Sequence, residues 1–338
     1  MQQISLRAPY LIFLGTETNA TYAKTGAGIV QWQREKCLGQ FHLPGGTVDL
    51  GIPELTIAAA AEAGAKSLVI GTAVIGGAIP ESWLETLILA MEHGLDIVAG
   101  VHTRLNDIPE LVGAAEQFGV QLIDVRVPPK DLPVGTGKKR SGKRLLTVGT
   151  DCALGKKYTA LAIAKELNDR GVAADFRASG QTGIMISGAG IPIDAVVSDF
   201  VSGAAEVLSP ENDPDHWDVI EGQGALHHPG YGAVSMGLLL GSQPDAFVVC
   251  TEAGRTVVSG WPDFPLPSLQ EVIDRTVEIG RRTNPKIKPV GISVNTSSLD
   301  EAEALSYLAE VEDETGLPAT DPIRFGVGKL VDALQREF

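Results

Sequence analysis

One stretch of the chain combines the residue types that bind phosphate. Residues 145–149 are apolar or β-branched up to Gly149, and the loop that follows ends at Gly155. Lys156 then opens a run of strong helix formers at helical spacing. The order is therefore strand, glycine-bounded loop, lysine and helix. In this arrangement the loop amides, the helix N-terminus and the lysine ammonium can all point at one anion. The stretch therefore predicts a phosphate-binding loop, with an ordinary strand–turn–helix connection as the competing interpretation.

The loop departs from the usual Walker A pattern, which has four residues between its glycines and a Ser or Thr after the lysine. Here five residues separate Gly149 from Gly155, and Lys157 occupies the position of the hydroxyl. Because that hydroxyl normally binds Mg²⁺ in nucleotide hydrolases, a second lysine in its place favours phosphate binding over ATP cleavage. The predicted phosphate-binding residues are Gly149, Thr150, Asp151, Cys152, Ala153, Leu154, Gly155, Lys156 and Lys157.

A second motif supplies candidate catalytic residues. Residues 216–221 read as a strand that ends in Glu221, and an acid at the end of a strand in a P-loop domain occupies the Walker B position. His227 and His228 follow in a glycine-rich loop, where an imidazole can act as acid or base. Adjacent histidines usually point in different directions, so we predict Glu221 and His228 as catalytic. A solvated acid and a structural imidazole are the alternatives, and no third residue at metal-ligand spacing indicates a metal site.

Other polar residues are candidates for binding the substrate. Gln181 and Thr182 follow a predicted strand at 173–177, and Arg126 and Arg255 follow two others. Arginine pairs well with carboxylates, so we predict that these four residues bind a substrate, although either arginine can equally be a surface residue.

Cys152 lies inside the phosphate loop, where a helix N-terminus can lower the pKa of a thiol. No histidine neighbours it in the sequence. A small residue that fills the loop is therefore preferred to a nucleophile.

Composition limits the classes of partner. The net charge is −15 over 338 residues, which argues against nucleic acid and anionic membranes. The three cysteines are widely spaced and indicate a reducing compartment. With no signal-peptide pattern and no apolar run of membrane-spanning length, we expect a cytoplasmic protein. The expected partners are small-molecule substrates and further copies of the same chain, although the sequence does not itself give the oligomeric state.

Short apolar strands alternate with helices throughout the chain, which predicts an α/β fold with parallel sheets. We expect an N-terminal domain at residues 1–127, a linker at 128–142 and a C-terminal domain at 143–338. The linker is rich in proline, glycine and lysine and is interpreted as solvated. In the first domain, residues 29–32 are predicted to form a strand after a glycine-containing turn.

Two resemblances add to this interpretation. The loop and the Glu-Gly-Gln-Gly at 221–224 are similar to those of dethiobiotin synthetases, which implies an ATP-dependent ligase or kinase. The wider set of motifs resembles a bacterial family long described as having no known function and now associated with D-glutamate N-acetyltransferase. The motifs that carry this second resemblance are residues 149–159, 180–183, 193–206, 221–224 and 228–229, with 70–71, 76–77, 100–102 and 124–126 in the first half.

The second resemblance implies a Rossmann-like N-terminal domain followed by a P-loop NTPase-like domain, and acetyl transfer from acetyl-CoA to D-glutamate. Coenzyme A carries phosphates, so the loop can bind it without hydrolysing anything; whether Mg²⁺ is bound stays open. Direct attack of the amine, with Glu221 or His228 as general base, is preferred to a covalent route through Cys152. An ATP-dependent enzyme and a nucleotide-sensing protein that only binds are the competing functions.

Overall fold

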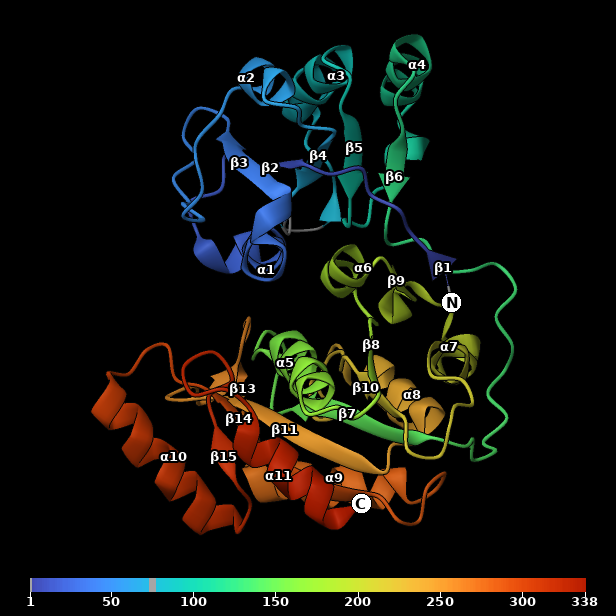
Figure 1. Ribbon diagram of the computed structural model, residues 1–338, viewed down its shortest axis with the longest axis vertical. Helices are drawn as coiled ribbons and strands as arrows, with labels where there is room; N and C mark the ends of the chain where they lie inside the picture. The colour runs from blue at the N-terminus through green and yellow to red at the C-terminus, as the bar shows by residue number, and fades with distance from the viewer. Residues whose placement is uncertain (1, 73–76) are drawn as a thin grey trace. The chain divides into compact units, whose positions relative to one another are not determined.

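The computed structural model describes residues 2–72 and 77–338, and the chain divides into two compact units (Figure 1). The N-terminal unit comprises residues 2–127 together with 184–192, and the P-loop unit comprises residues 128–183 and 193–338. Gly76, one of the glycines that carries the family resemblance, lies outside the described residues. Within the described part of the chain, no helix has both the length and the apolar character needed to span a membrane.

The N-terminal unit contains a five-stranded sheet in which every neighbouring pair is parallel. Its spatial order is β3 (Cys37–His42), β2 (Tyr10–Gly15), β4 (Ser67–Ile70), β5 (Asp96–Ala99) and β6 (Leu122–Asp124). The helices are α1 (Lys24–Trp32), α2 (Ile57–Glu62), α3 (Leu84–Glu92) and α4 (Pro109–Phe118). Helices α2 to α4 cover one face of the sheet and α1 covers the other (Figure 1). The pair β1 (Gln2–Gln3) and β9 (Ala189–Gly190) is antiparallel.

The predicted strand at residues 29–32 is wrong, because these residues form the end of helix α1. The buried positions of this helix include Gly26, Ile29 and Val30, whose spacing of three to four residues matches a helical face. Gly26 also donates its backbone N–H to the carbonyl of Gly71 at the end of β4 (2.8 Å). The β-branched pair favoured a strand in the sequence, but burial of one helical face against the sheet outweighs that weak local preference.

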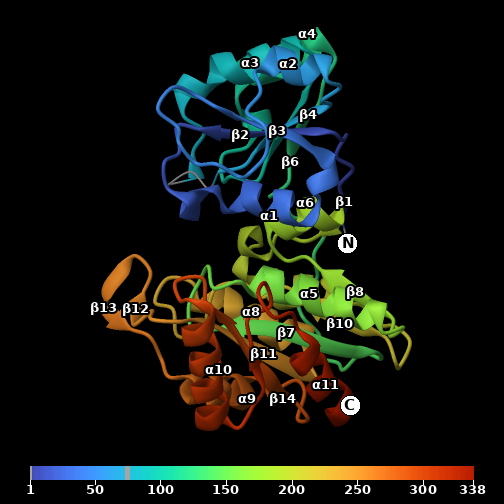
Figure 2. The same ribbon diagram turned by 60° about the vertical axis from the view of Figure 1, so that its left-hand side comes forward.

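The P-loop unit contains a six-stranded, all-parallel sheet. Its order is β15 (Ala319–Thr320), β14 (Lys288–Asn295), β11 (Ala246–Glu252), β7 (Lys143–Gly149), β10 (Trp217–Ile220) and β8 (Ala174–Arg177). The helices are α5 (Lys156–Asp169), α7 (Val201–Leu208), α8 (Gly232–Ser242), α9 (Leu269–Gly280), α10 (Glu301–Thr315) and α11 (Gly328–Glu337). Helix α6 (Gln181–Ser187) begins in this unit, and its residues from 184 onward belong to the N-terminal unit. Figure 2 shows the antiparallel hairpin of β12 (Val257–Val258) and β13 (Trp261–Pro265) at the edge of this unit.

Strand β7 lies between β10 and β11, so the phosphate loop starts from the middle of the sheet. Leu145 faces a core that includes Ala160 and Ile163 of α5 and Val219 of β10, all of them buried. Since parallel strands end at the same edge, the loops after β7, β8, β10 and β11 gather there. The predicted α/β fold with two parallel sheets is therefore confirmed.

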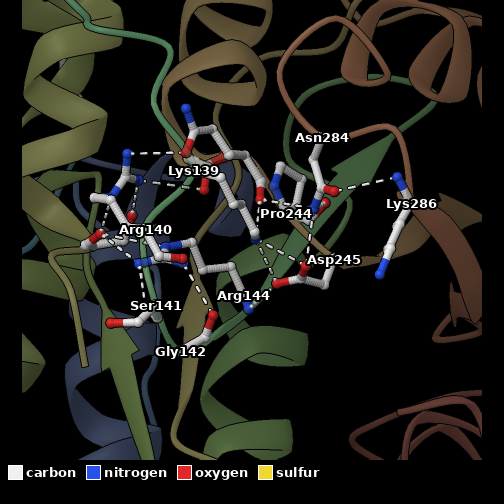
Figure 3. Close-up of polar contacts among 12 residues, drawn as sticks. Lys139, Arg140, Ser141, Gly142, Arg144, Pro244, Asp245, Asn284 and Lys286 are labelled. Carbon is white, nitrogen blue, oxygen red and sulfur yellow. Dashed lines mark hydrogen bonds and ion pairs between the residues drawn. The ribbon is translucent and has the colours of Figure 1, made fainter. Parts of the chain in front are cut away.

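Residues 128–142 are largely exposed, but two of their cations, Lys139 and Arg140, bind to other parts of the P-loop unit, which the sequence interpretation missed (Figure 3). Lys139 Nζ donates to Asp245 Oδ1 (2.8 Å), and Arg140 Nε donates to the carbonyl of Ser209 (2.8 Å). Arg144, at the start of β7, is fully buried and donates to the carbonyls of Ser141 (3.0 Å) and Pro210 (2.8 Å). Burial lowers the pKa of this guanidinium, and the carbonyl oxygens replace the water it has lost.

The segment also passes so close to α7 that one position there must be glycine. A Cβ on Gly203 would lie 1.7 Å from the carbonyl oxygen of Pro133, which is backbone and cannot rotate away. Gly203→Ala should therefore destabilise the P-loop unit by about 2–3 kcal/mol, as overpacking does elsewhere. Thermal denaturation measures the effect, with Gly328→Ala as control because a Cβ there meets only the end of the Arg170 side chain at 3.5 Å. Equal melting temperatures for the two variants would refute this account of the segment.

Candidate phosphate and acyl-transfer site

The phosphate loop runs from the end of β7 to the start of α5. Gly149 lies against β11, since a Cβ there would be 2.9 Å from the carbonyl oxygen of Cys250. Thr150 donates its N–H to that same carbonyl (3.1 Å). Gly155 has φ +100° and Ala153 has φ +55°, a left-handed conformation that glycine adopts easily and alanine rarely. These contacts and turns hold the loop over the N-terminus of a 14-residue helix, the geometry that binds anions.

Lys156 is buried and folded back onto its own loop, where Nζ donates to the carbonyl of Asp151 (2.7 Å). Burial lowers the pKa of this ammonium. Its methylene chain passes Gly222, where a Cβ would lie 3.1 Å from Lys156 Cδ and only 1.7 Å from the carbonyl oxygen of Thr147. A glycine after Glu221 is thus required for the end of β10 to pack beneath the lysine.

Asp151 connects the loop to the segment that follows β11. Its carboxylate is fully buried, and Oδ2 accepts from Arg255 Nη1 (3.0 Å) and from the backbone N–H of Ser259 (2.9 Å). Oδ1 accepts from the N–H of Cys152 (2.6 Å). A buried carboxylate is stable only when its oxygens are bonded in this way. One side chain therefore fixes both the shape of the loop and the position of the hairpin.

Arg255 makes further hydrogen bonds to the loop and to the end of β11. Its Nη1 also donates to the carbonyl of Cys152 (3.0 Å), and its Nη2 donates to Glu252 Oε2 (2.6 Å). The guanidinium thus already pairs with two acids of the chain. The predicted role of Arg255 in binding a substrate carboxylate stays a prediction. Arg126 belongs to the N-terminal unit, and its predicted role in binding a substrate also stays a prediction.

Glu221 is buried rather than solvated, which excludes the interpretation of an acid facing water. Its Oε2 accepts from the backbone N–H groups of Ser179 and Gly180, both at 3.0 Å. Burial raises the pKa of Glu221 to about 7, against the opposing effects of the Lys157 charge and the two N–H donors. Lys157 therefore acts electrostatically on the Walker B acid from the position where other P-loops place the Mg²⁺-binding hydroxyl.

Gln181 and Thr182 begin helix α6 directly after these N–H donors. The neighbouring Gly183 lies against the carboxyl, because a Cβ there would be 2.4 Å from Glu221 Oε2. The structure thus brings two predicted substrate-binding residues to the same strand ends as the predicted catalytic acid.

His228 is buried, and its ring is held in one orientation. Its Nδ1 accepts from the backbone N–H groups of Gly230 (3.0 Å) and Tyr231 (3.2 Å), so the proton of the neutral ring lies on Nε2. Nε2 lies 3.7 Å from Asp151 Oδ1. Burial lowers the pKa of the imidazole and keeps it neutral. This tautomer presents a donor toward the phosphate loop, and the lone pair that a base needs is already bonded.

Among the residues that the structure describes, two groups have side-chain ligand atoms close enough together to hold a metal ion: Asp151, Cys152 and His228, and Asp175, His216 and Asp218. In both groups a guanidinium already pairs with an acid. Arg255 donates to Asp151 as described above, and Arg177 Nε donates to Asp218 Oδ1 (2.7 Å). In each group one acid is therefore already neutralised by an arginine of the chain, and the expectation that no metal is bound stays a prediction.

Comparison with known proteins assigns the chain to a family. A model described as a domain of unknown function, DUF1611_N, Rossmann-like domain, matches residues 42–128. A second, DUF1611_C, P-loop domain, matches residues 133–331. The chain belongs to the DUF1611 family. The crystal structure of a DUF1611 family protein from Anabaena variabilis is 34% identical with a TM-score of 0.88, over 97% of this chain and 99% of that one.

Two DUF1611 relatives carry a functional name. The D-glutamate N-acetyltransferase of Tritonibacter scottomollicae is 50% identical over 97% of this chain and 99% of its own length. The D-glutamate N-acetyltransferase of a Pseudoalteromonas species is 42% identical over 97% and 99%. The predicted family and the expectation of an acyltransferase enzyme are thereby confirmed.

Several residues of the DUF1611 site were missed in the sequence. Ser179 and Gly180, which bond Glu221, precede the predicted Gln181, and only the fold reveals their N–H direction. Ser259 and Trp261 lie in the hairpin at 257–265, which was not predicted. A signal for it was present, because Val257 and Val258 are followed by Ser-Gly and then by Trp261, a pattern typical of a tight hairpin.

The pKa of Glu221 predicts how stability depends on pH. The folded pKa of about 7 exceeds the ordinary value of 4.5, so the native state binds the proton more tightly than the unfolded state. The stabilisation is present below pH 4.5 and is lost as the pH rises through 7. Relative to Glu221→Gln, the wild type should lose on the order of 3 kcal/mol over that range. Urea unfolding between pH 5 and pH 8 measures most of it.

Glu271→Gln is the matched control, because Glu271 is an exposed capping residue of α9 whose pKa is lowered, mainly by its backbone hydrogen bond with Ser268. It titrates below the measured range, so its difference from the wild type should not change with pH. A difference between wild type and Glu221→Gln that is equally flat would contradict the assignment of a raised pKa.

Proposed function

We propose that the chain transfers an acetyl group from acetyl-CoA to the amino group of D-glutamate, with the phosphate loop binding the phosphates of coenzyme A. The observation that carries this proposal is 50% identity, over nearly the full length, to a protein named D-glutamate N-acetyltransferase. The names of these two relatives supply the proposed substrate and its stereochemistry. The donor and the role of the loop are argued from the chain itself.

The loop suits an anion that is held and not cleaved. Lys156 and Lys157 put two positive charges beside the helix N-terminus, and Lys157 replaces the hydroxyl that would bind Mg²⁺. A phosphate on the loop would take the Lys156 ammonium from the carbonyl of Asp151, and a charged acceptor binds it more strongly than a neutral one. The pyrophosphate of coenzyme A meets these requirements without a metal.

Acetyl transfer also needs a base and an oxyanion donor. The ammonium of glutamate must lose one proton before its nitrogen attacks the thioester carbonyl. The nitrogen then loses a second proton as the carbon–sulfur bond breaks, and the departing thiolate of coenzyme A takes up a proton, so that one proton is released overall. Glu221, with a pKa of about 7, is matched to proton removal at neutral pH. His228 is assigned the donor role by its tautomer, together with the loop amides. Arg126 or Arg255, with Gln181 and Thr182, is proposed to bind the carboxylates of glutamate.

An ATP-dependent ligase or kinase is the second candidate. It is favoured by the position of Glu221 at the end of β10, beside the loop, where P-loop enzymes place an acid. Lys157 counts against it. The two functions differ in their products, since the ligase or kinase releases ADP and the acetyltransferase releases free thiol.

The proposal predicts free thiol from acetyl-CoA and D-glutamate in the presence of EDTA, and no ADP from ATP. Lys156→Ala should raise the KM for acetyl-CoA about 10- to 100-fold, because one charge-assisted contact to phosphate is lost. Lys165→Ala is the control, since Lys165 lies on the same helix and its side chain pairs only with Asp169 on the surface. Release of ADP with no thiol would replace this function by the second candidate. Unchanged acetyl-CoA kinetics in folded Lys156→Ala would remove the loop from donor binding.

Direct attack and a covalent route through Cys152 also make different predictions. Direct attack requires both substrates on the enzyme together, whereas an acetylated cysteine gives ping-pong kinetics. We expect Cys152→Ala to keep most of kcat and the wild type to show intersecting lines in double-reciprocal plots. Loss of all turnover in Cys152→Ala with intact acetyl-CoA binding, and an acetylated Cys152 in the wild type by mass spectrometry, would establish the covalent route instead.

A further inference from the structure

An aromatic cluster borders the phosphate loop. The rings of His228 and Tyr231 are packed at a centroid distance of 4.6 Å with planes 36° apart. Trp261 of the hairpin meets both rings edge-on, at 4.7 Å from His228 and 5.9 Å from Tyr231. The cluster therefore joins the loop after β10 to the hairpin after β11, two segments that are far apart in the sequence.

The cluster is fixed to the loop through Asp151. His228 Nε2 lies 3.7 Å from Asp151 Oδ1, and Ser259, in the turn of the hairpin that carries Trp261, donates its N–H to Asp151 Oδ2 (2.9 Å). Two backbone N–H groups hold the His228 ring on its other side. The His228 ring that packs against Tyr231 is thus buried and held by hydrogen bonds, while Tyr231 itself is 49% exposed.

This combination differs from ordinary core packing. Tyrosine loses little side-chain entropy when it binds, because its ring was already held, and a flat ring that packs against His228 and is still 49% exposed offers a stacking surface. Beside it lies a loop built to hold phosphates. A ligand that uses both features has an aromatic ring a short distance from a pyrophosphate, which describes an adenine nucleotide. Aromatic stacking of bases is a common part of nucleotide binding and requires no specific hydrogen bonds.

We propose that Tyr231 is the stacking platform for the adenine ring of coenzyme A while the phosphate loop holds the pyrophosphate. This inference rests on the proposed function, because the adenine of ATP would fit the same description. It makes Tyr231 a binding residue for the adenosine end of the donor only. The acetylated pantetheine arm, which carries the reacting thioester, lies at the other end of coenzyme A.

The test compares two donors that share the reacting end. Acetyl-CoA contains adenosine, and S-acetyl-4′-phosphopantetheine contains the same thioester arm without it. We expect Tyr231→Leu to raise the KM for acetyl-CoA roughly 10- to 100-fold, the usual effect of removing one stacking partner, and to leave the KM for S-acetyl-4′-phosphopantetheine unchanged. Tyr231→Phe keeps the ring and should behave as wild type. Phe264→Leu, which removes another exposed aromatic ring of the same hairpin (47% exposed), is the matched control.

Each other outcome overturns the inference in a recognisable way. Equal rises in KM for both donors would mean that Tyr231 supports the loop and does not contact adenine. No change for either donor would place the adenine elsewhere. If the wild type uses neither donor but calorimetry shows that ATP binds and that Tyr231→Leu weakens it, the proposed function fails and the ring serves ATP instead.

Discussion

The buried carboxylate of Asp151 is the interaction on which the rest of the site depends. It bonds the N–H of Cys152 within the loop, the guanidinium of Arg255 and the N–H of Ser259 in the hairpin. An ionised group with no exposed surface is costly unless every oxygen is paired, so these partners are held in place as firmly as the carboxylate itself. The ring of His228, which two backbone N–H groups orient, lies with Nε2 3.7 Å from the same carboxylate.

Charge explains how a protein with a net charge of −15 can bind an anion. The cations near the loop are Lys156, Lys157 and Arg255, and each opposes a specific acid or carbonyl in the structure. Glu221 lies under the loop with a raised pKa, so part of the local negative charge is neutralised near pH 7. The local charge therefore differs from the total charge of the chain, which is what the proposed binding of a phosphate without a metal requires.

The sequence predicted those parts of the molecule whose local residue pattern is typical of one element of structure. Strands β7 and β10, helix α5 and the loop between Gly149 and Lys156 were predicted because apolar runs, glycines and a lysine occur together in a fixed order. The strand predicted at residues 29–32 was wrong because two β-branched residues outweighed the helical spacing of the buried positions. Propensity is a weak signal where tertiary packing decides.

The remaining features depend on contacts between distant segments. The tautomer of His228 follows from the backbone direction at Gly230 and Tyr231, which no residue type encodes. Glu221 can be buried because its carboxylate accepts hydrogen bonds from the backbone N–H groups of Ser179 and Gly180, which follow strand β8. Arg255, which is predicted to bind a substrate carboxylate, also pairs with Asp151 and Glu252 of its own unit. In each case the sequence points to the residue, and only the fold shows which groups it contacts.

The central claim is that the phosphate loop holds coenzyme A without a metal, and a crystal structure of the protein with coenzyme A in the presence of EDTA tests it most directly. The account predicts pyrophosphate density within hydrogen-bond distance of the amides between Thr150 and Lys156. It also predicts that Lys156 Nζ leaves the carbonyl of Asp151 for a phosphate oxygen. Coenzyme A bound away from the loop, with Lys156 still on that carbonyl, would contradict it.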